Sequence, residues 1–226
     1  MTDDASSELR LIEVERHPQG PGVDRVTIET NRGAIDCRLH DTDQPDAAVV
    51  WVGGAGGGLK GPAGGLYPRL ASTLQLEGTG SLRVDYRQPS QLAACVLDTL
   101  MGVAYLQSLG YQRFILVGHS FGGAVVIMAG VQLDAVVGVA TLASQTAGVA
   151  VVSDLAPRPI FLAHGPADHV LPVSCSRELY ARAKDPRELK LYEGCDHSFE
   201  ECRQLLEDDL LAWMRGVFAG AGDHHE

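Results

Sequence analysis

Continuous apolar runs, separated by segments of helix length, constrain the fold of this chain more than any other feature. Residues 47–52 are apolar throughout, as expected for a strand that is buried on both faces of a parallel sheet. Further strands are predicted at residues 81–85, 113–117, 135–142, 159–163 and 188–192. Helices are predicted between or after them at residues 66–76, 92–109, 122–132, 176–183 and 199–218. This alternation predicts an α/β fold with a mostly parallel, doubly wound sheet.

An antiparallel hairpin is predicted ahead of this series. Residues 25–30 and 34–40 alternate apolar and polar side chains, as in strands with one face in water. Asn31-Arg32-Gly33 between them offers a turn. The parallel sheet is therefore expected to carry an N-terminal antiparallel hairpin.

The chain is expected to form one domain. Its 226 residues suffice for one large α/β domain with a sizeable core, and no internal repeat or linker divides them. We expect this domain over residues 23–219. A loosely held polar leader is expected at residues 1–22, and a frayed polar tail at residues 220–226.

Charge and hydropathy argue against several classes of partner. The 29 acidic residues outnumber the 18 basic ones, giving a net charge of −11, so no basic face is available for nucleic acid. No apolar run reaches the roughly 18 residues of a membrane helix, and residues 1–10 do not resemble a secretory signal. We therefore expect a soluble cytoplasmic protein with neither nucleic acid nor membrane as partner. The choice between monomer and homodimer stays open.

The cysteines predict neither a disulfide framework nor a metal site. The chain has five of them, Cys37, Cys95, Cys175, Cys195 and Cys202. Their number is odd, they are scattered, and no CxxC pair or histidine at zinc spacing accompanies them. We expect reduced thiols, no metal and no cofactor.

The strongest chemical signal is the hexapeptide Gly118-His119-Ser120-Phe121-Gly122-Gly123. It directly follows a predicted buried strand and opens a predicted helix. A serine in G-x-S-x-G occupies a strained strand-to-helix turn, where larger neighbours two residues away would collide. The pattern predicts that the hydroxyl of Ser120 projects above the sheet as a nucleophile.

A serine nucleophile needs a base, and the base needs an orienting carboxylate. Asp168 follows the predicted strand 159–163, and His197 follows the predicted strand 188–192. The carboxyl ends of parallel strands meet at one edge of a sheet, so both residues are expected beside Ser120. We predict a triad of Ser120, His197 and Asp168. Asp196 is the alternative acid.

These residues resemble the α/β-hydrolase superfamily, and in particular the small relatives of dienelactone hydrolase. The resemblance runs from about Arg25 to Phe218 and includes four motifs. They are the hexapeptide at 118–123, the turn at 165–168, and the tetrapeptides Asp196-His197-Ser198-Phe199 and Val84-Asp85-Tyr86-Arg87. The resemblance implies an α/β-hydrolase fold and acyl chemistry. Dienelactone hydrolase itself uses a cysteine nucleophile where this chain has Ser120, so its lactone specificity does not transfer.

The oxyanion hole of such a hydrolase uses two backbone N–H groups, one after the nucleophile and one from a loop near it. These are predicted to be the N–H groups of Phe121 and Ala55, the latter in the glycine-rich loop 53–58. The resemblance places a His-Gly pair where this chain has Gly53-Gly54. Gly54 and Gly56 are alternative donors.

The same loop also suggests a dinucleotide site. Gly56-x-Gly58-x-x-Gly61 matches G-x-G-x-x-G, and Asp85 ends the next predicted strand, where a ribose-binding acid would lie. However, the match begins several residues after the strand. Residues 62–65 also delay the helix that should bind the pyrophosphate. We therefore favour the oxyanion loop.

The length of the segment between two predicted strands, 135–142 and 159–163, also indicates what size of substrate the site accepts. Residues 143–158 suit one short helix or a loop, and they are too few for a cap domain. We expect an open site for a small or partly exposed acyl compound, because a long-chain lipase would cover its groove with a lid. The expected pocket residues are Leu59, Phe121, Val170, Leu171 and Phe199, with Gln145 as a polar contact.

The sequence therefore predicts a serine hydrolase that cleaves small carboxylic esters or thioesters through an acyl-enzyme on Ser120. Acyl transfer to a nucleophile other than water would use the same residues. A hydrolase-fold protein that binds without catalysis is the alternative from a different class.

Overall fold

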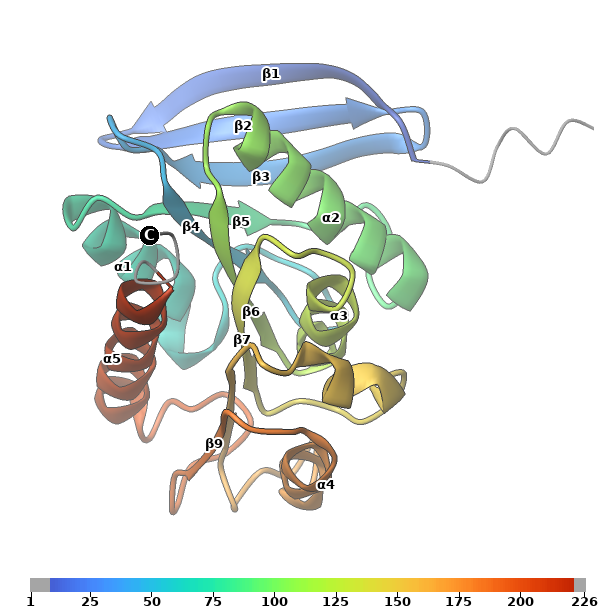
Figure 1. Cartoon of the computed structure of the whole chain (residues 1–226), viewed down its shortest axis with the longest axis vertical. Helices are drawn as coiled ribbons and strands as arrows, with labels where there is room; N and C mark the ends of the chain where they lie inside the picture. The colour runs from blue at the N-terminus through green and yellow to red at the C-terminus, as the bar shows by residue number, and fades with distance from the viewer. Residues whose placement is uncertain (1–8, 222–226) are drawn as a thin grey trace, which may run out of the picture.

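One sheet of nine strands runs through the protein, in the order β1-β2-β3-β5-β4-β6-β7-β8-β9 (Figure 1). The structure is a computed structural model that describes residues 9–221. The strands are β1 (Leu11–Gly20), β2 (Val23–Thr30), β3 (Gly33–His40), β4 (Ala47–Val52), β5 (Gly80–Val84), β6 (Arg113–His119), β7 (Val136–Leu142), β8 (Ile160–His164) and β9 (Arg187–Leu191). Neighbours are antiparallel from β1 to β5 and parallel from β5 to β9. The predicted hairpin and parallel sheet are confirmed.

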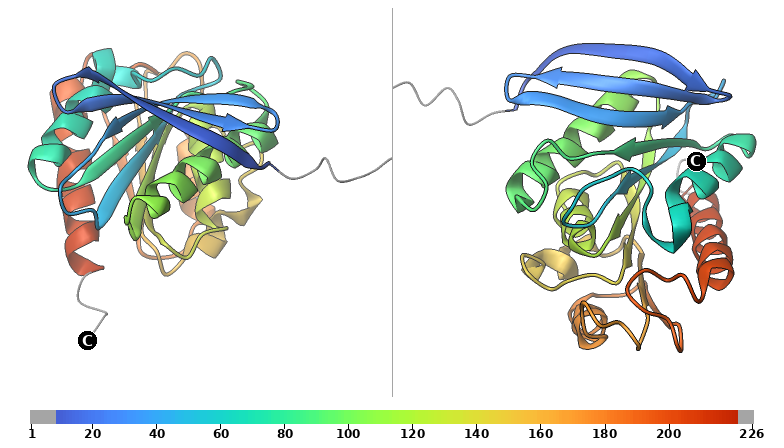
Figure 2. Two further views of the ribbon diagram at one scale, coloured as in Figure 1. Left: turned by 90° about the horizontal axis from the view of Figure 1, so that it is seen from above. Right: turned by 180° about the vertical axis from the view of Figure 1, so that it is seen from behind.

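Helices cover both faces of the sheet. In Figure 1, α1 (Pro62–Leu76) and α5 (Arg203–Gly220) lie on the left, while α2 (Leu92–Ser108), α3 (Phe121–Gly130) and α4 (Ser174–Arg182) lie on the right. Ala63, Gly64 and Gly65 have left-handed backbone angles, so the regular part of α1 begins at Leu66, as predicted. Figure 2 shows the same layers from above and from behind.

The central strands are apolar throughout because each face packs against helices. In β6, Phe114 and Leu116 contribute to the core under α2 and α3, whereas Ile115 and Val117 contribute to the core under α1 and α5. Since successive side chains of a strand point to opposite faces, two buried faces require an unbroken apolar run. The carboxyl ends of these strands are thereby held at one edge of the sheet.

The prediction of a loosely held leader is wrong for residues 11–20, which form the edge strand β1. Its residues are mostly exposed and pair with β2 through the main chain. Arg16 adds ion pairs to Asp24 at 2.5 Å and to Asp41 at 2.8 Å. An exposed strand needs no apolar alternation, and Pro18 weakens the pattern further, so the sequence offered little signal. Residues 1–8 of the expected leader lie outside the described residues.

The C-terminal helix α5 extends through Gly220, one residue beyond the expected domain end. Residues 222–226 of the expected tail lie outside the described part of the chain. Between β7 and β8 the chain forms only a short 3₁₀ helix, η1 (Ala150–Leu155), in line with the prediction that no cap domain fits there. Among residues 9–221, no helix is both long and apolar enough to span a membrane.

Two of the five cysteines are paired, which corrects the expectation of reduced thiols only. Cys195 and Cys202 form a disulfide, with Cα atoms 6.0 Å apart. Two successive turns after β9 bring them together, since Cys195 N–H donates to Tyr192 O and Phe199 N–H to Asp196 O. The spacing of the cysteines along the chain does not show that these turns bring Cys195 and Cys202 together. Cys37, Cys95 and Cys175 are free.

Candidate active site

Ser120 lies in a tight turn between β6 and α3. Its backbone angles, φ 57° and ψ −119°, fall in a region that residues other than glycine rarely adopt, at a typical cost of about 1–3 kcal/mol. A Cβ on Gly118 would lie 2.1 Å from Gly122 O, and one on Gly122 would lie 2.3 Å from Gly53 O. The glycines are therefore a steric requirement of this turn, as the sequence pattern predicted.

The surroundings of the Ser120 turn hold it at the edge of the sheet. Ser120 N–H donates to Leu142 O, at the end of β7, at 2.8 Å. Phe121 is the first residue of α3, and N–H groups in the first turn of a helix lack an intrahelical partner. On the other side, a Cβ on Gly54 would lie 3.4 Å from Ser120 Cβ, so Gly54 lies beside the serine. Ala55 follows it and is exposed.

Asp168 lies in the turn after β8, with its side chain fully buried. Its Oδ1 accepts hydrogen bonds from Val170 N–H at 2.7 Å and Leu171 N–H at 2.8 Å. Burial acts to raise the pKa of Asp168, but these N–H groups and His197 outweigh burial, so its pKa is lowered. The carboxylate is therefore held in its charged form.

His197 lies in the loop between β9 and α5 and faces Asp168. Its Nδ1 is 2.7 Å from Asp168 Oδ2. The neighbouring Asp196 uses Oδ1 to accept from His197 N–H at 2.7 Å and from His169 N–H at 3.0 Å. Asp196 thus stabilises the loop through main-chain N–H groups, whereas Asp168 contacts the imidazole ring.

His119 ends β6, immediately before Ser120, and contacts the loop that carries His197. Its Nε2 is 3.0 Å from His197 O, and the two imidazole rings are 4.8 Å apart between centroids. Burial lowers the pKa of His119 to about 4. His119 is therefore a neutral residue that can donate to the main chain of His197.

Side chains from the segment after β5 hold the glycine-rich loop in place. Tyr86 Oη donates to Gly53 O at 3.1 Å, and Ser90 Oγ donates to Ala55 O at 2.8 Å. Asp85 Oδ1 accepts from Gly58 N–H at 2.6 Å. Sequence reasoning missed these contacts, because they join segments that are separated along the chain.

The contact between Asp85 and Gly58 argues against the alternative of a dinucleotide site. A ribose-binding carboxylate must keep its oxygen atoms available to the ribose hydroxyl groups. Asp85 instead accepts from Gly58 within the loop itself. The glycine-rich loop is therefore held as a turn by residues of the segment after β5.

The site opens into two adjoining depressions. One, of about 660 Å³, is lined by residues that include Lys60, His119, Val170 and His197. The other, of about 430 Å³, is lined by residues that include Leu59, Asp85, Lys60 and His119. Because Lys60 and His119 belong to both, the depressions form one shallow region around the histidines.

Only some of the expected pocket residues line these depressions. Leu59 and Val170 do. Phe199 does not: its side chain is fully buried and packs edge-on against Tyr192, so its assignment to the pocket is wrong. Leu171 and Gln145 are half-buried and line neither depression. Apolar character alone did not distinguish a core residue from a pocket wall.

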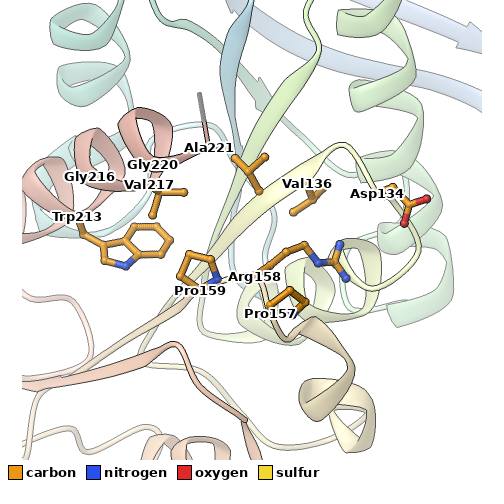
Figure 3. Close-up of a pocket in the computed structure, with 11 residues that line it drawn as sticks. Asp134, Val136, Pro157, Arg158, Pro159, Trp213, Gly216, Val217, Gly220 and Ala221 are labelled. Carbon is orange, nitrogen blue, oxygen red and sulfur yellow. The ribbon is translucent and has the colours of Figure 1, made fainter. Parts of the chain in front are cut away.

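A third cavity, of about 580 Å³, lies at the opposite edge of the sheet (Figure 3). Trp213 and Val217 of α5 face Pro159 and Val136, which stand at the amino ends of β8 and β7. Ser120, Asp168 and His197 all follow carboxyl ends of strands. This apolar cavity is therefore separate from the candidate active site.

Among residues 9–221, no cluster of three or more histidine, cysteine, aspartate or glutamate side chains is arranged to hold a metal ion.

The strand order, the strained serine turn and the acid and histidine after β8 and β9 define an α/β hydrolase. The sequence profile of the dienelactone hydrolase family matches residues 80–211, more than half of the chain. The chain therefore belongs to the dienelactone hydrolase family.

The chain is also similar to a curated protein and, in its fold, to solved structures. The uncharacterized protein YfhR of Escherichia coli is 30% identical over 118 residues, which cover 42% of this chain and 42% of YfhR. The matched part thus spans less than half of that relative. Among solved structures, a protein of unknown function from Agrobacterium tumefaciens, assigned to the α/β hydrolases, aligns with a TM-score of 0.74 and 19% identity over 87% of this chain and 97% of its own. Dienelactone hydrolase from Anabaena variabilis aligns with a TM-score of 0.73 and 14% identity over 90% and 98%.

Proposed function

We propose that the protein is a serine hydrolase that cleaves small carboxylic esters or thioesters. The observation that carries this proposal is the arrangement at one sheet edge. Ser120 occupies a strained turn there, and His197 Nδ1 faces the buried Asp168 carboxylate at 2.7 Å. A serine, a histidine and an oriented carboxylate are the groups that acyl transfer from an ester requires.

In the first step, Ser120 Oγ attacks the carbonyl carbon of the substrate while His197 Nε2 takes the hydroxyl proton. Asp168 holds His197 in the tautomer that leaves Nε2 free to accept, and it stabilises the imidazolium that forms. The carbon–oxygen or carbon–sulfur bond to the leaving group then breaks, and His197 returns the proton to that group. An acyl-enzyme on Ser120 remains.

In the second step, water attacks the acyl-enzyme, with His197 again taking and returning a proton. The negative charge on the carbonyl oxygen in both steps is assigned to two N–H groups. One belongs to Phe121 at the start of α3, and the other to Ala55 or its neighbour Gly54, which lies beside Ser120. A preorganised donor of this kind is worth about 3 kcal/mol of the barrier.

The shape of the site supports small substrates. The depressions around His197 are shallow, and the only helix between β7 and β8 within the described residues is η1. A long acyl chain would therefore remain largely in water. We propose short acyl groups, with the identity of the alcohol or thiol set by the rim around Lys60 and Val170.

A fluorophosphonate probe tests the proposal, because it phosphonylates only a serine that is activated by its base. The expected result is labelling of the wild-type protein at Ser120, no labelling of Ser120→Ala, and hydrolysis of p-nitrophenyl acetate faster than of long-chain p-nitrophenyl esters. No labelling and no turnover would favour the binding module without catalysis. Labelling with turnover only in the presence of an added alcohol or thiol acceptor would favour the acyltransferase.

A further inference from the structure

A second buried histidine contacts the acid of the proposed triad. His164 ends β8, and its side chain, like that of Asp168, is fully buried. Its Nε2 lies 3.2 Å from Asp168 Oδ2 and 3.0 Å from Leu171 O. Oδ2 is the same oxygen atom that faces His197 Nδ1. The Asp168 carboxylate therefore lies between two imidazole rings.

The partners of His164 determine where its proton lies. Carboxylate and carbonyl oxygen atoms only accept hydrogen bonds, so Nε2 must carry the proton. Nδ1 is then an acceptor, and the buried Ser176 of α4 donates to it across 2.7 Å. Burial lowers the pKa of His164, in keeping with a neutral ring.

The two oxygen atoms of Asp168 have different partners. Oδ1 is occupied by the main-chain N–H groups of Val170 and Leu171. These bonds hold the turn, and any residue with an acceptor at this position would keep them. Oδ2 faces only side chains, His197 on one side and His164 on the other. His164 is therefore, besides His197, the side chain in contact with Oδ2.

We propose that His164 is a positioning residue of the active site, which holds Asp168 Oδ2 against His197 and shares the charge of the carboxylate. This inference rests on the proposed function, since it needs Asp168 and His197 to act as a pair. The proposed triad then continues through His164 to Ser176. His164 touches no substrate and acts only through Asp168.

A test by pH dependence must consider every charged group near this pair. The titratable groups near His197 and Asp168 come from five parts of the chain: His164 of β8, His119 of β6, Asp196 and Glu200 of the loop between β9 and α5, Lys60 before α1 and Cys175 of α4. The variants below change the contact from His164 and leave the other groups in place.

The decisive variant is the double substitution His164→Phe/Ser176→Ala, which keeps the ring volume and removes the hydroxyl that would lose its acceptor. For hydrolysis of p-nitrophenyl acetate, kcat should fall about tenfold with little change in KM, because a hydrogen bond to a charged group is lost. The acidic limb of the pH profile of kcat should move to higher pH. With its charge no longer shared, the Asp168 carboxylate stabilises the protonated form of the catalytic base more strongly.

Two conservative substitutions of His164 separate its role in positioning Asp168 from its role in packing. The amide nitrogen of His164→Gln reaches the Nε2 position and should restore kcat to within about threefold of wild type, whereas the shorter His164→Asn reaches only the Nδ1 position and should not. His169→Gln, at an exposed neighbouring histidine, is the control and should keep the wild-type profile. Ser176→Ala alone leaves the contact between His164 and Asp168 in place and should lower kcat less than the double variant.

Failure of the proposed function and failure of the role of His164 would give different experimental results. If hydrolysis survives Ser120→Ala, the proposed function fails. If hydrolysis requires Ser120 but the folded double variant keeps the wild-type kcat and pH profile, only the role of His164 is overturned. Should the double variant fail to fold, equal activity of His164→Gln and His164→Asn would overturn the role instead.

Discussion

The two sides of the candidate active site are built by different means. On the nucleophile side, the main chain places Ser120 through a positive φ and glycines at which a Cβ would collide with neighbouring carbonyl groups. On the acid–base side, a hydrogen bond between side chains 29 residues apart joins Asp168 to His197. The nucleophile side thus follows mainly from the main chain of one hexapeptide, packed against Gly53. The acid–base side depends on two loops that meet, so point substitutions there should break function without breaking the fold.

The largest effect is expected from Ser120→Ala, which tests the nucleophile side. The substitution deletes the hydroxyl, while the surrounding glycines and Leu142 O still accommodate the turn. Turnover of p-nitrophenyl acetate should fall by about 10⁶-fold. A circular dichroism spectrum and melting temperature close to wild type would show that the fold is intact. Residual turnover near the wild-type rate would remove Ser120 from the mechanism.

The next largest effect concerns the choice of acid. In Asp168→Asn, the amide oxygen keeps the bonds from Val170 and Leu171, so the amide nitrogen faces His197 Nδ1. This forces the imidazole proton onto Nε2, where a base must be free. The value of kcat should fall about 10⁴-fold.

The matched control is Asp196→Asn, which keeps the acceptor for His197 N–H and His169 N–H. It should lower kcat by about tenfold or less, since tautomer and ring orientation are unchanged. The reverse ranking of the two variants would show that the acid–base side is assembled differently from the contacts described above.

A smaller effect is expected where tertiary contacts support the nucleophile side. Asp85→Ala removes the acceptor for Gly58 N–H and so loosens the loop that carries the proposed oxyanion donor. We expect kcat to fall about tenfold at unchanged KM, less than the loss caused by deleting such a donor. Asp85→Asn keeps an acceptor oxygen and should be nearly wild type. Equal losses in both variants would point to the charge of Asp85 rather than to its hydrogen bond.

No effect is expected from removing metal ions, because both sides of the proposed mechanism use only protein groups. Exhaustive dialysis against EDTA should leave kcat and KM for p-nitrophenyl acetate unchanged within error. A loss of activity that a divalent cation restores would contradict the mechanism on both sides.

Much of the fold was predictable because it follows from short-range rules. An apolar run marks a strand buried on both faces, and the alternation of such runs with helices specifies a parallel sheet whose carboxyl ends share an edge. That edge is where Ser120, Asp168 and His197 were expected. The strand β1 was missed because an exposed edge strand is held by main-chain pairing, which leaves little trace in side-chain pattern.

The sequence by itself determined the turn at Ser120 and the sheet edge at which the acid and base lie, since both follow from local sterics and from chain direction. Only the tertiary structure decided which carboxylate faces His197, how Asp85 and Tyr86 hold the glycine-rich loop, and that His164 contacts Asp168. It also decided that Phe199 belongs to the core and that Cys195 pairs with Cys202. These are contacts between residues from different turns and loops, and their geometry depends on how the loops fold against one another.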